Sequence, residues 1–248
     1  MSKIIVITGA GVGLGRALAR RFVADGDQVV LLGRTLSKVE ATANELGDKA
    51  MAVECDVASI DSVKSAFAEI AKRHPKIDVL INNAAVYEPS LIAESTDAQV
   101  LQAVNINFMG PIICARAAIP MMGPGGHIIN VSSESVGINP FPHLVLYQAS
   151  KAGLEAFSRG LFFELQESGI RVSNVRAGQM IDMEKPMVMA DPAAWKRFGE
   201  AAAKAGINFM QRPLSQVQSV TDAFRAVIDS PPDVQLVHVE ISARTPTE

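Results

Sequence analysis

Two side chains that could exchange a proton stand four positions apart, in the segment Tyr147-Gln148-Ala149-Ser150-Lys151. Residues four apart share one face of a helix, so the phenol of Tyr147 and the ammonium of Lys151 would be neighbours. Free tyrosine has a pKa of about 10, and a close cation would favour the phenolate and allow proton exchange nearer neutrality. We therefore predict Tyr147 as an acid/base assisted by Lys151, although such a pair taken alone could also be an exposed contact.

A hydroxyl group that could hold a substrate oxygen lies upstream of this pair. The segment Ile129-Asn130-Val131 leads into Ser132 and Ser133, and we predict a strand that ends there. A hydroxyl at this strand end could hydrogen-bond a carbonyl or alcohol oxygen and stabilise the charge that develops on it. We favour Ser133, although the sequence does not separate it from Ser132 and Ser135.

A glycine-rich segment could hold a dinucleotide. Directly after the first predicted strand, residues 8–15 read Thr-Gly-Ala-Gly-Val-Gly-Leu-Gly, and a helix begins near Arg16. Glycines let the chain turn sharply and approach a pyrophosphate, while the helix N-terminus offers unpaired N–H groups. The alternative is a tight strand-to-helix turn without a ligand. We predict cofactor contacts from Gly9, Gly11, Val12, Gly13, Leu14 and Gly15.

The end of the second predicted strand bears on which cofactor binds. An acidic residue that binds the ribose 2′-hydroxyl of NAD is expected about 20 residues past the glycines. Here the chain has Gly33 and Arg34 and no acid. Gly33 leaves room and Arg34 supplies a cation for a 2′-phosphate, which favours NADP (NADPH) over NAD. The alternative is a solvated arginine at the start of a helix, and Val12 stands where a second basic residue would have strengthened the case.

Two more segments follow predicted strands, and the carboxyl ends of parallel strands form the ligand-binding edge of such a sheet. Asp56, after the third strand, could accept a hydrogen bond from the adenine amino group. Asn82 and Asn83 end the fourth strand, and asparagine also caps turns. For Asn82 we favour that structural role over cofactor contact.

The sequence alternates short Val/Ile-rich runs with amphipathic stretches. This pattern predicts the strands and helices that position these residues, and it is typical of a parallel sheet with helices on both faces. The predicted strands are Ile4–Thr8, Gln28–Leu32, Ala50–Cys55, Val79–Asn82, His127–Ser132, Arg171–Arg176 and Leu236–Ile241. The predicted helices are Arg16–Asp25, Leu36–Leu46, Asp61–Arg73, Gln99–Met122, Leu146–Ser168 and Val220–Ser230. The fold class is therefore α/β, a doubly wound (Rossmann) sheet of about seven strands forming one catalytic domain over residues 1–248.

Composition excludes several classes of protein. The 248 residues are 48% hydrophobic and 20% charged, which suits a globular chain with a large core. A net charge of −3 without basic runs argues against nucleic-acid binding. Cys55 and Cys114 are isolated, so neither a zinc site nor a disulfide framework is indicated, and we predict no metal. The first apolar run is too short for a signal sequence or membrane span, which leads us to expect a cytoplasmic protein.

In their joint order and spacing, these motifs resemble the short-chain dehydrogenase/reductase family over essentially the whole chain. The matching features are the 8–15 loop, Asp56-Val57, Asn82-Asn83-Ala84-Ala85, Asn107, Ser133, and Tyr147 with Lys151. The resemblance implies a tetrad in which Tyr147 is the acid/base, Ser133 positions the oxygen, and Lys151 holds the nicotinamide ribose and lowers the tyrosine pKa. It also implies that Asn107 keeps a water in a proton relay, with Asn105 as the alternative. Further implied cofactor contacts are Val57, Asn83, Ala84, Ala85, Tyr147, Lys151, Ala177, Gly178 and Met180.

The chain departs from the family pattern after its sixth predicted strand. Ala177-Gly178 replaces the usual Pro-Gly, and Asp182 replaces the threonine that commonly follows. This puts the contact to the nicotinamide amide in doubt. Ala85, where the family most often has glycine, is expected to be neutral.

A segment over about 179–214 resembles the family's substrate-binding loop. Its methionines, with Trp195 and Phe198, suit a bulky apolar ketone or secondary alcohol. The alternative is core or subunit-interface packing. Helices 99–122 and 146–168 are apolar on more than one face, and in relatives such helices pair, which implies a homodimer or homotetramer.

Two other functions are alternatives to a dehydrogenase. An epimerase or isomerase would retain its cofactor through turnover, and a non-catalytic NADP-binding sensor would keep the fold without the chemistry. The intact set of Ser133, Tyr147 and Lys151 argues against the sensor, whereas the isomerase has to be separated from a dehydrogenase by experiment.

Overall fold

The computed structural model describes residues 2–137, 142–184, 191–208 and 211–244. Its centre is a parallel sheet with the strand order β3-β2-β1-β4-β5-β6-β9. The strands are β1 (Ile4–Thr8), β2 (Gln28–Gly33), β3 (Ala50–Glu54), β4 (Val79–Asn82), β5 (His127–Ser133), β6 (Arg171–Ala177) and β9 (His238–Ile241). The order reverses between β1 and β4, so the predicted doubly wound sheet is confirmed.

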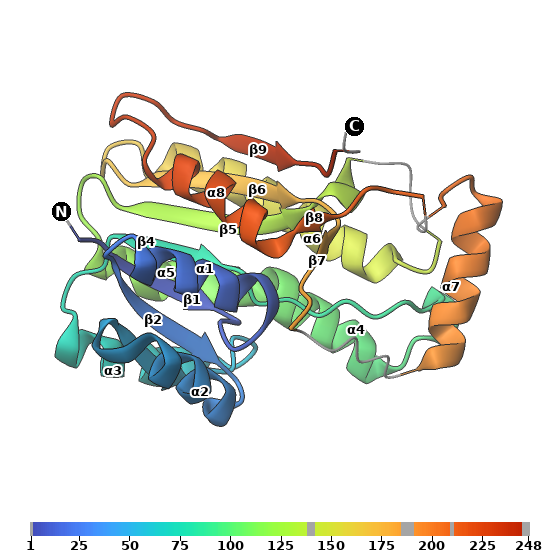
Figure 1. The fold of residues 1–248 in the computed structure, drawn as a ribbon, viewed down its shortest axis with the longest axis horizontal. Helices are drawn as coiled ribbons and strands as arrows, with labels where there is room; N and C mark the ends of the chain where they lie inside the picture. Colours follow the sequence, from blue (N-terminus) through green and yellow to red (C-terminus); the bar gives the residue numbers. More distant parts are fainter. Residues whose placement is uncertain (1, 138–141, 185–190, 209–210, 245–248) are drawn as a thin grey trace.

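Helices cover both faces of the sheet (Figure 1). They are α1 (Gly13–Ala24), α2 (Leu36–Leu46), α3 (Ile60–Arg73), α4 (Asp97–Val104), α5 (Gly110–Ala118), α6 (Val145–Glu164), α7 (Pro192–Lys204) and α8 (Val217–Ile228). Successive side chains of a strand point to opposite faces, and β1 shows the result. Ile5 and Ile7 pack in the core under α1, α2 and α8, whereas Val6 packs in the core under α3, α5 and α6.

The predicted helix over 99–122 is wrong in detail, because the structure divides it. Between α4 and α5 lies a π-helical turn, Asn105–Met109, and a short 3-10 turn, Ile119–Met121, follows α5. Pro111 has no N–H to donate to the carbonyl four residues back, at Asn107, so the α-helical ladder is interrupted here. Single π-helical turns are frequent at functional sites.

Other boundaries differ by a few residues, as element ends usually do. The helix predicted to end at Ser168 ends at Glu164, and the last strand begins at His238 rather than Leu236. In the segment over about 179–214, predicted as a substrate-binding loop, the structure has α7 and the strand β7 (Met180–Ile181), which pairs with β8 (Ser215–Gln216) just after the segment.

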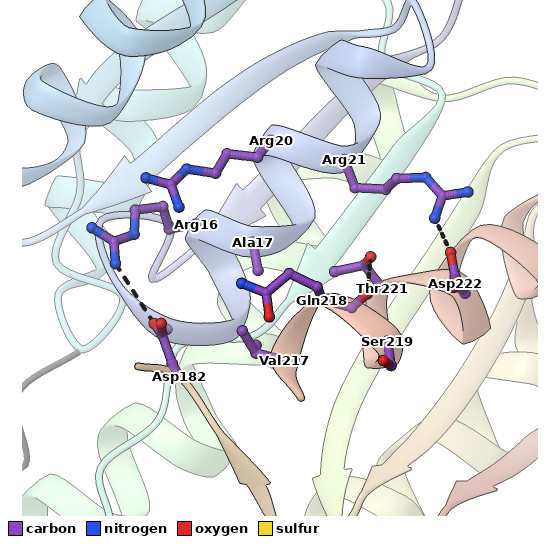
Figure 2. A pocket seen from close by; sticks show the side chains of 11 residues that line it. Arg16, Ala17, Arg20, Arg21, Asp182, Val217, Gln218, Ser219, Thr221 and Asp222 are labelled. Carbon is purple, nitrogen blue, oxygen red and sulfur yellow. Dashed lines mark hydrogen bonds and ion pairs between the residues drawn. The ribbon is translucent and has the colours of Figure 1, made fainter. Parts of the chain in front are cut away.

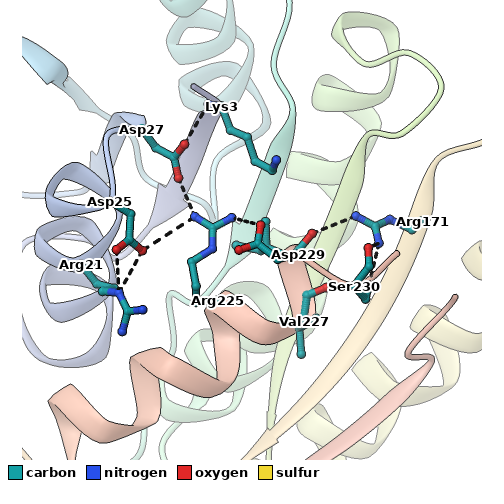
Figure 3. A network of polar contacts seen from close by, with 10 residues as sticks. Lys3, Arg21, Asp25, Asp27, Arg171, Arg225, Val227, Asp229 and Ser230 are labelled. Carbon is teal, nitrogen blue, oxygen red and sulfur yellow. Dashed lines mark hydrogen bonds and ion pairs between the residues drawn. The ribbon is translucent and has the colours of Figure 1, made fainter. Parts of the chain in front are cut away.

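A partly buried polar network closes the end of the sheet where the strands begin (Figure 3). Arg225 of α8 binds Asp27 at 2.6 Å and Asp229 at 2.5 Å, and its guanidinium lies over the ring of Phe22. Asp27 in turn accepts a hydrogen bond from the backbone N–H of Lys3. Since these residues lie at the start of β1 and β2, they stabilise the fold at the end opposite the predicted site.

One helical run among the described residues, Asp97–Met121, is long and apolar enough to cross a membrane by length and composition. About two-fifths of its apolar window is buried inside the fold, and it packs against α3 and α6. These contacts are those of a helix in the core of a globular domain.

Candidate active site

The glycine-rich segment forms the turn between β1 and α1 that the sequence predicts. Gly9 and Gly13 adopt positive φ values of 66° and 59°. A Cβ on Gly9 would lie 2.9 Å from the Cα of Ala84, and one on Gly15 would lie 2.4 Å from the carbonyl oxygen of Gly9. Only glycine fits these places, so the chain keeps its backbone close packed where a pyrophosphate would be held.

The N-terminus of α1 is suited to an anion. Its N-cap residue, Val12, offers no side-chain acceptor, and no acidic residue stands in the first turn. The first N–H groups of a helix have no partner within the helix, and the dipole favours negative charge at this end. The residues present therefore fit the phosphates of a nicotinamide dinucleotide.

The strand end after β4 is tied to this turn through Thr8. The Thr8 hydroxyl accepts hydrogen bonds from the backbone N–H groups of Asn83 and Ala84, both at 3.0 Å. The Asn83 side chain donates to the Thr8 carbonyl at 2.9 Å. Asn82 is buried and donates to Asn130 of β5 at 2.8 Å. Its role is structural, as favoured from the sequence, although it bridges two strands rather than capping a turn.

At the end of β3, Asp56 lies beside the start of α3. One of its carboxylate oxygens accepts from the N–H of Ala58 at 3.0 Å, which is an Asx-type turn. Val57 contacts α5 so closely that a Cβ on Gly110 would lie 3.0 Å from it. The contact of Asp56 with an adenine stays a prediction.

Arg34 follows β2 and is exposed at the start of α2. Its guanidinium has no hydrogen bond or ion pair with any part of the chain that the structure describes. A second cationic residue, Lys38, lies in the first turn of α2 and packs against the glycine turn: a Cβ on Gly11 would lie 2.9 Å from the Lys38 Cβ. Lys38 was not singled out from the sequence.

The structure separates the three candidate serines. The Ser133 hydroxyl interacts with the phenol of Tyr147 and lowers its pKa. Ser135 supports it, since its N–H and hydroxyl donate to the Ser133 oxygen at 3.2 and 3.0 Å. Ser132 instead donates to the carboxylate of Glu155 at 2.6 Å. Ser133 is therefore the serine that the fold brings to Tyr147.

Tyr147 and Lys151 lie on α6, as predicted, but the balance of effects on the tyrosine differs from the expectation. Burial raises the pKa of Tyr147, the hydrogen bond with Ser133 lowers it, and the charge of Glu134 raises it again. The Lys151 ammonium is not among these influences. It donates to the carbonyl oxygen of Val131 at 2.7 Å, and burial lowers the pKa of Lys151 to about 8. In this chain desolvation outweighs the expected lowering of the tyrosine pKa.

Asn107 occupies the π-helical turn and is fully buried. Its carboxamide accepts from the N–H of Val86 at 2.8 Å and donates to the carbonyl of Val86 at 2.9 Å. It also donates to the hydroxyl of Ser150, the residue before Lys151, at 3.1 Å. Asn107 thus joins the segment after β4 to α6. Its contact with Lys151 through a water stays a prediction.

After β6 the chain passes Ala177 and Gly178 into β7. Position 178 has room only for glycine because β9 passes close to it: a Cβ there would lie 2.3 Å from the carbonyl oxygen of Ile241. Met180 packs on the core under α1 and α8.

Asp182 stands where the family commonly has threonine. It faces α1 and forms an ion pair with Arg16 at 3.6 Å. Both residues line a cavity of about 460 Å³ between α1 and α8 (Figure 2). Its carboxylate also accepts a hydrogen bond from the N–H of Glu184. Its described partners therefore belong to α1 and to its own segment.

Aromatic rings surround the tyrosine. Tyr87 meets Tyr147 edge to face with ring centroids 4.9 Å apart, and Trp195 of α7 lies 5.4 Å from Tyr87. Phe198 packs on Trp195 and is buried. Figure 1 shows α7 beyond the carboxyl ends of the strands. Two residues of the predicted loop thus lie at the site, whereas Met187, Met189, Phe209 and Met210 lie outside the described residues.

Glu134 was not recognised from the sequence. It follows Ser133 directly, is 8% exposed, and accepts a hydrogen bond from Arg212 at 2.8 Å. Its partner is 78 positions away, so no local pattern indicated the pair. Metal ligands do not come together in the described ranges: no three His, Cys, Asp or Glu side chains form a cluster there.

Comparisons with known proteins agree with this geometry. Residues 3–189 match the family model described as short chain dehydrogenase. The chain is 32% identical to carbonyl reductase family member 4 of Danio rerio, over 86% of this chain and 93% of that protein. It is 30% identical to an NADP-dependent 3-hydroxy acid dehydrogenase of Salmonella typhi, over 96% and 94%. The solved structure of a 3-ketoacyl-(acyl-carrier-protein) reductase from Brucella melitensis, complexed with NADH, is similar with a TM-score of 0.78, 25% identity and 96% of each chain covered.

Proposed function

The chain belongs to the short-chain dehydrogenase/reductase family and is an oxidoreductase acting on CH–OH groups, and we propose that it interconverts a ketone or aldehyde with its alcohol, preferring NADPH to NADH. The observation that carries the proposal is the arrangement at the end of β5, where Ser133 lies beside Tyr147 and Lys151 of α6 binds the carbonyl of Val131, on the strand edge that also bears the glycine turn. A carbonyl oxygen placed between the two hydroxyl groups would be positioned and protonated by neighbouring residues.

The proton movement follows from these positions. When bound, the nicotinamide cofactor supplies the hydride to the carbonyl carbon. Tyr147 gives its phenolic proton to the oxygen as negative charge develops there, and Ser133 holds that oxygen by a hydrogen bond. Lys151 is held by the Val131 carbonyl at the base of the site, one helical turn from Tyr147, and would hold the nicotinamide ribose rather than lower the resting pKa of the tyrosine. In the oxidative direction the same groups act in reverse.

The preference for NADPH is supported by two cationic residues that follow β2. Arg34 is exposed and without an acidic partner among the described residues, and Lys38, in the first turn of α2, packs against Gly11. A 2′-phosphate carries more negative charge than the hydroxyl it replaces, so it gains more from these side chains. The Salmonella typhi relative is NADP-dependent, whereas the Brucella melitensis structure contains NADH. Family membership therefore does not fix the cofactor, and we base the preference for NADPH on Arg34 and Lys38.

A rather apolar substrate is supported by the rings above the site. Tyr87 and Trp195 present aromatic surface near Tyr147, and Leu144 and Phe198 form the buried cluster against which Tyr147 and Trp195 pack. Apolar walls with a few polar groups at the reacting atoms are typical of small-molecule sites. We propose a hydrophobic ketone or secondary alcohol as substrate.

The experiment that tests the function is a screen of ketones, aldehydes and alcohols, followed by NADPH and NADH absorbance. A dehydrogenase changes the cofactor in proportion to product. An epimerase or isomerase forms product without net change in absorbance, and a sensor binds NADPH without any product. Stoichiometric oxidation of NADPH with an apolar ketone is the result expected here.

We further propose a homodimer or homotetramer. Leu101 and Val104 of α4 and Phe163 of α6 are exposed to 58%, 43% and 73%, which is unusual for large apolar side chains on helices next to one another. Sedimentation of the purified chain would test this, and a monomer at micromolar concentration would contradict it. The cytoplasmic location stays a prediction.

A further inference from the structure

Glu134 places a carboxylate where the proposed chemistry does not need one. It opens the short 3-10 turn Glu134–Val136 directly after Ser133, and it is buried. Its charge raises the pKa of Tyr147, because a negative group nearby disfavours the phenolate. A carboxylate left alone here would oppose the formation of the phenolate that reduction leaves behind.

Arg212 binds this carboxylate. It lies near the end of the segment over about 179–214 that resembles the family's substrate-binding loop, which we call the substrate segment. It lies between α7 and β8, and its Nη2 donates to the Glu134 Oε1 at 2.8 Å. The two side chains are 27% and 11% exposed, so the ion pair is partly removed from water. A guanidinium on a carboxylate in such surroundings is a strong, directional contact that offsets the charge.

The pair is also fixed from the side of the sheet. Gly178 follows β6 and lies so close that a Cβ on it would stand 3.2 Å from Glu134 Oε2. The carboxylate is thus enclosed by the end of β5, the end of β6 and the returning substrate segment. A movement of that segment would separate Arg212 from Glu134.

We propose, resting on the function above, that Glu134 and Arg212 are a positioning pair: Arg212 seats the returning end of the substrate segment beside Ser133 and screens the Glu134 carboxylate from Tyr147. Neither residue is assigned to the reacting atoms. Their influence passes through Tyr147, so the acid strength of that phenol becomes coupled to the seating of the segment.

Other titratable groups face Tyr147 within the described chain. Tyr87 meets its ring, Lys151 lies one helical turn further along α6, and Glu88 lines a small cavity beside it. From α7 the rings of Trp195 and Phe198 bring no charge. A test therefore has to isolate the contribution of the pair from these groups.

The composition of the chain allows a direct measurement. Tyr87 and Tyr147 are its two tyrosines and Trp195 is its one tryptophan. In a Tyr87→Phe chain, the ultraviolet absorbance of phenolate reports Tyr147 alone, without substrate or cofactor. Trp195 fluorescence, recorded in the same titration, marks the pH range in which the fold is intact.

In that background Glu134→Gln is expected to shift phenolate formation to lower pH, and Arg212→Gln to higher pH. The two effects should not add: in the Glu134→Gln chain, Arg212→Gln should have much less effect, because the charge it screens is gone. Arg212→Lys should restore the parent behaviour in part. Arg197→Gln, which breaks an exposed ion pair with Glu94 on the same segment, is the matched control and should leave the titration unchanged.

An Arg212→Gln shift of equal size with and without Glu134, or no shift at all, would overturn the proposal. Either of these results would leave the proposed function standing, since the titration involves no turnover. Conversely, absence of turnover with every carbonyl compound would refute the proposed function and leave the titration readable.

Discussion

The ammonium of Lys151 donates a hydrogen bond to the carbonyl oxygen of Val131 at 2.7 Å from a side chain that is 2% exposed. A charge so far from water is held against a desolvation penalty, which is why burial lowers the pKa of Lys151 to about 8. The bond fixes the lysine beneath the site, one helical turn from Tyr147. The placement that serves the proposed chemistry is therefore unfavourable for stability.

Lys151→Met should stabilise the protein at pH 7. The shift of the Lys151 pKa from 10.5 to about 8 corresponds to a desolvation penalty of about 3 kcal/mol, which the substitution removes. The substitution also removes the hydrogen bond to Val131, which destabilises the folded state by about 1 kcal/mol. A net gain of about 2 kcal/mol in the free energy of unfolding is expected by urea titration.

The sign of this effect depends on pH. The folded-state pKa is lowered, so the penalty is complete below about pH 8, declines as pH rises toward 10.5, and is absent above it. The advantage of Lys151→Met should accordingly shrink at pH 9.5. An advantage that is the same at pH 7 and 9.5 would contradict this explanation.

Tyr147→Phe should remove turnover and leave NADPH binding nearly unchanged. The substitution deletes the exchangeable proton while keeping the ring against Tyr87. Loss of a general acid lowers the rate by about 100-fold or more. Single-turnover absorbance and NADPH fluorescence titration measure the two quantities. Arg159→Ala, at an exposed position further along α6, is the control, and activity retained in Tyr147→Phe would exclude the mechanism.

The sequence predicted most of the fold because buried strands are written as continuous apolar runs. Ile5 to Ile7 and Leu80 to Ile81 are buried strands as expected. Helix α7 escaped recognition although Asp191 caps it and Pro192 begins it, because its alanine-rich sequence stands between methionine-rich stretches. The π-helical turn depends on Pro111 and on contacts of Asn107 with a distant backbone, which no local period records.

The site was less predictable where partners are distant in sequence. The family order of motifs brought Ser133, Tyr147 and the glycine turn together, whereas the choice between Ser132 and Ser133 depended on their distant partners. Ser132 donates to Glu155, which lies on α6 as Tyr147 does and also pairs with Arg176. Long-range ion pairs such as that of Glu134 became visible only in the folded chain.

Cofactor choice should depend on Arg34 and Lys38 together. Arg34→Ala and Lys38→Ala should each raise the Kd for NADPH by about tenfold, the equivalent of about 1.4 kcal/mol for a charge-assisted contact, with little change for NADH. Fluorescence titration with both cofactors gives the ratio. Lys76→Ala removes a cation elsewhere on the surface and should change neither Kd. Equal losses for NADPH and NADH would show that these side chains do not read the 2′-phosphate.

Two glycine substitutions should separate the cofactor turn from ordinary helix positions. Gly15→Ala would place a Cβ 2.4 Å from the Gly9 carbonyl oxygen, which forces the turn apart. It should destabilise the protein by about 2 kcal/mol or more, as overpacking does, and abolish NADPH binding. Gly160→Ala lies on the exposed side of α6, where an added Cβ meets no atom within 4 Å.

That second substitution should instead raise the free energy of unfolding by about 0.5 to 1 kcal/mol, since alanine is the better helix former, and leave binding unchanged. Urea unfolding and NADPH titration of both variants give a paired comparison within one chain. If Gly15→Ala bound NADPH as the parent does, the hypothesis that the glycine turn closely approaches the phosphates would be wrong. The destabilisation of Gly15→Ala would then reflect packing between β1 and α1 alone.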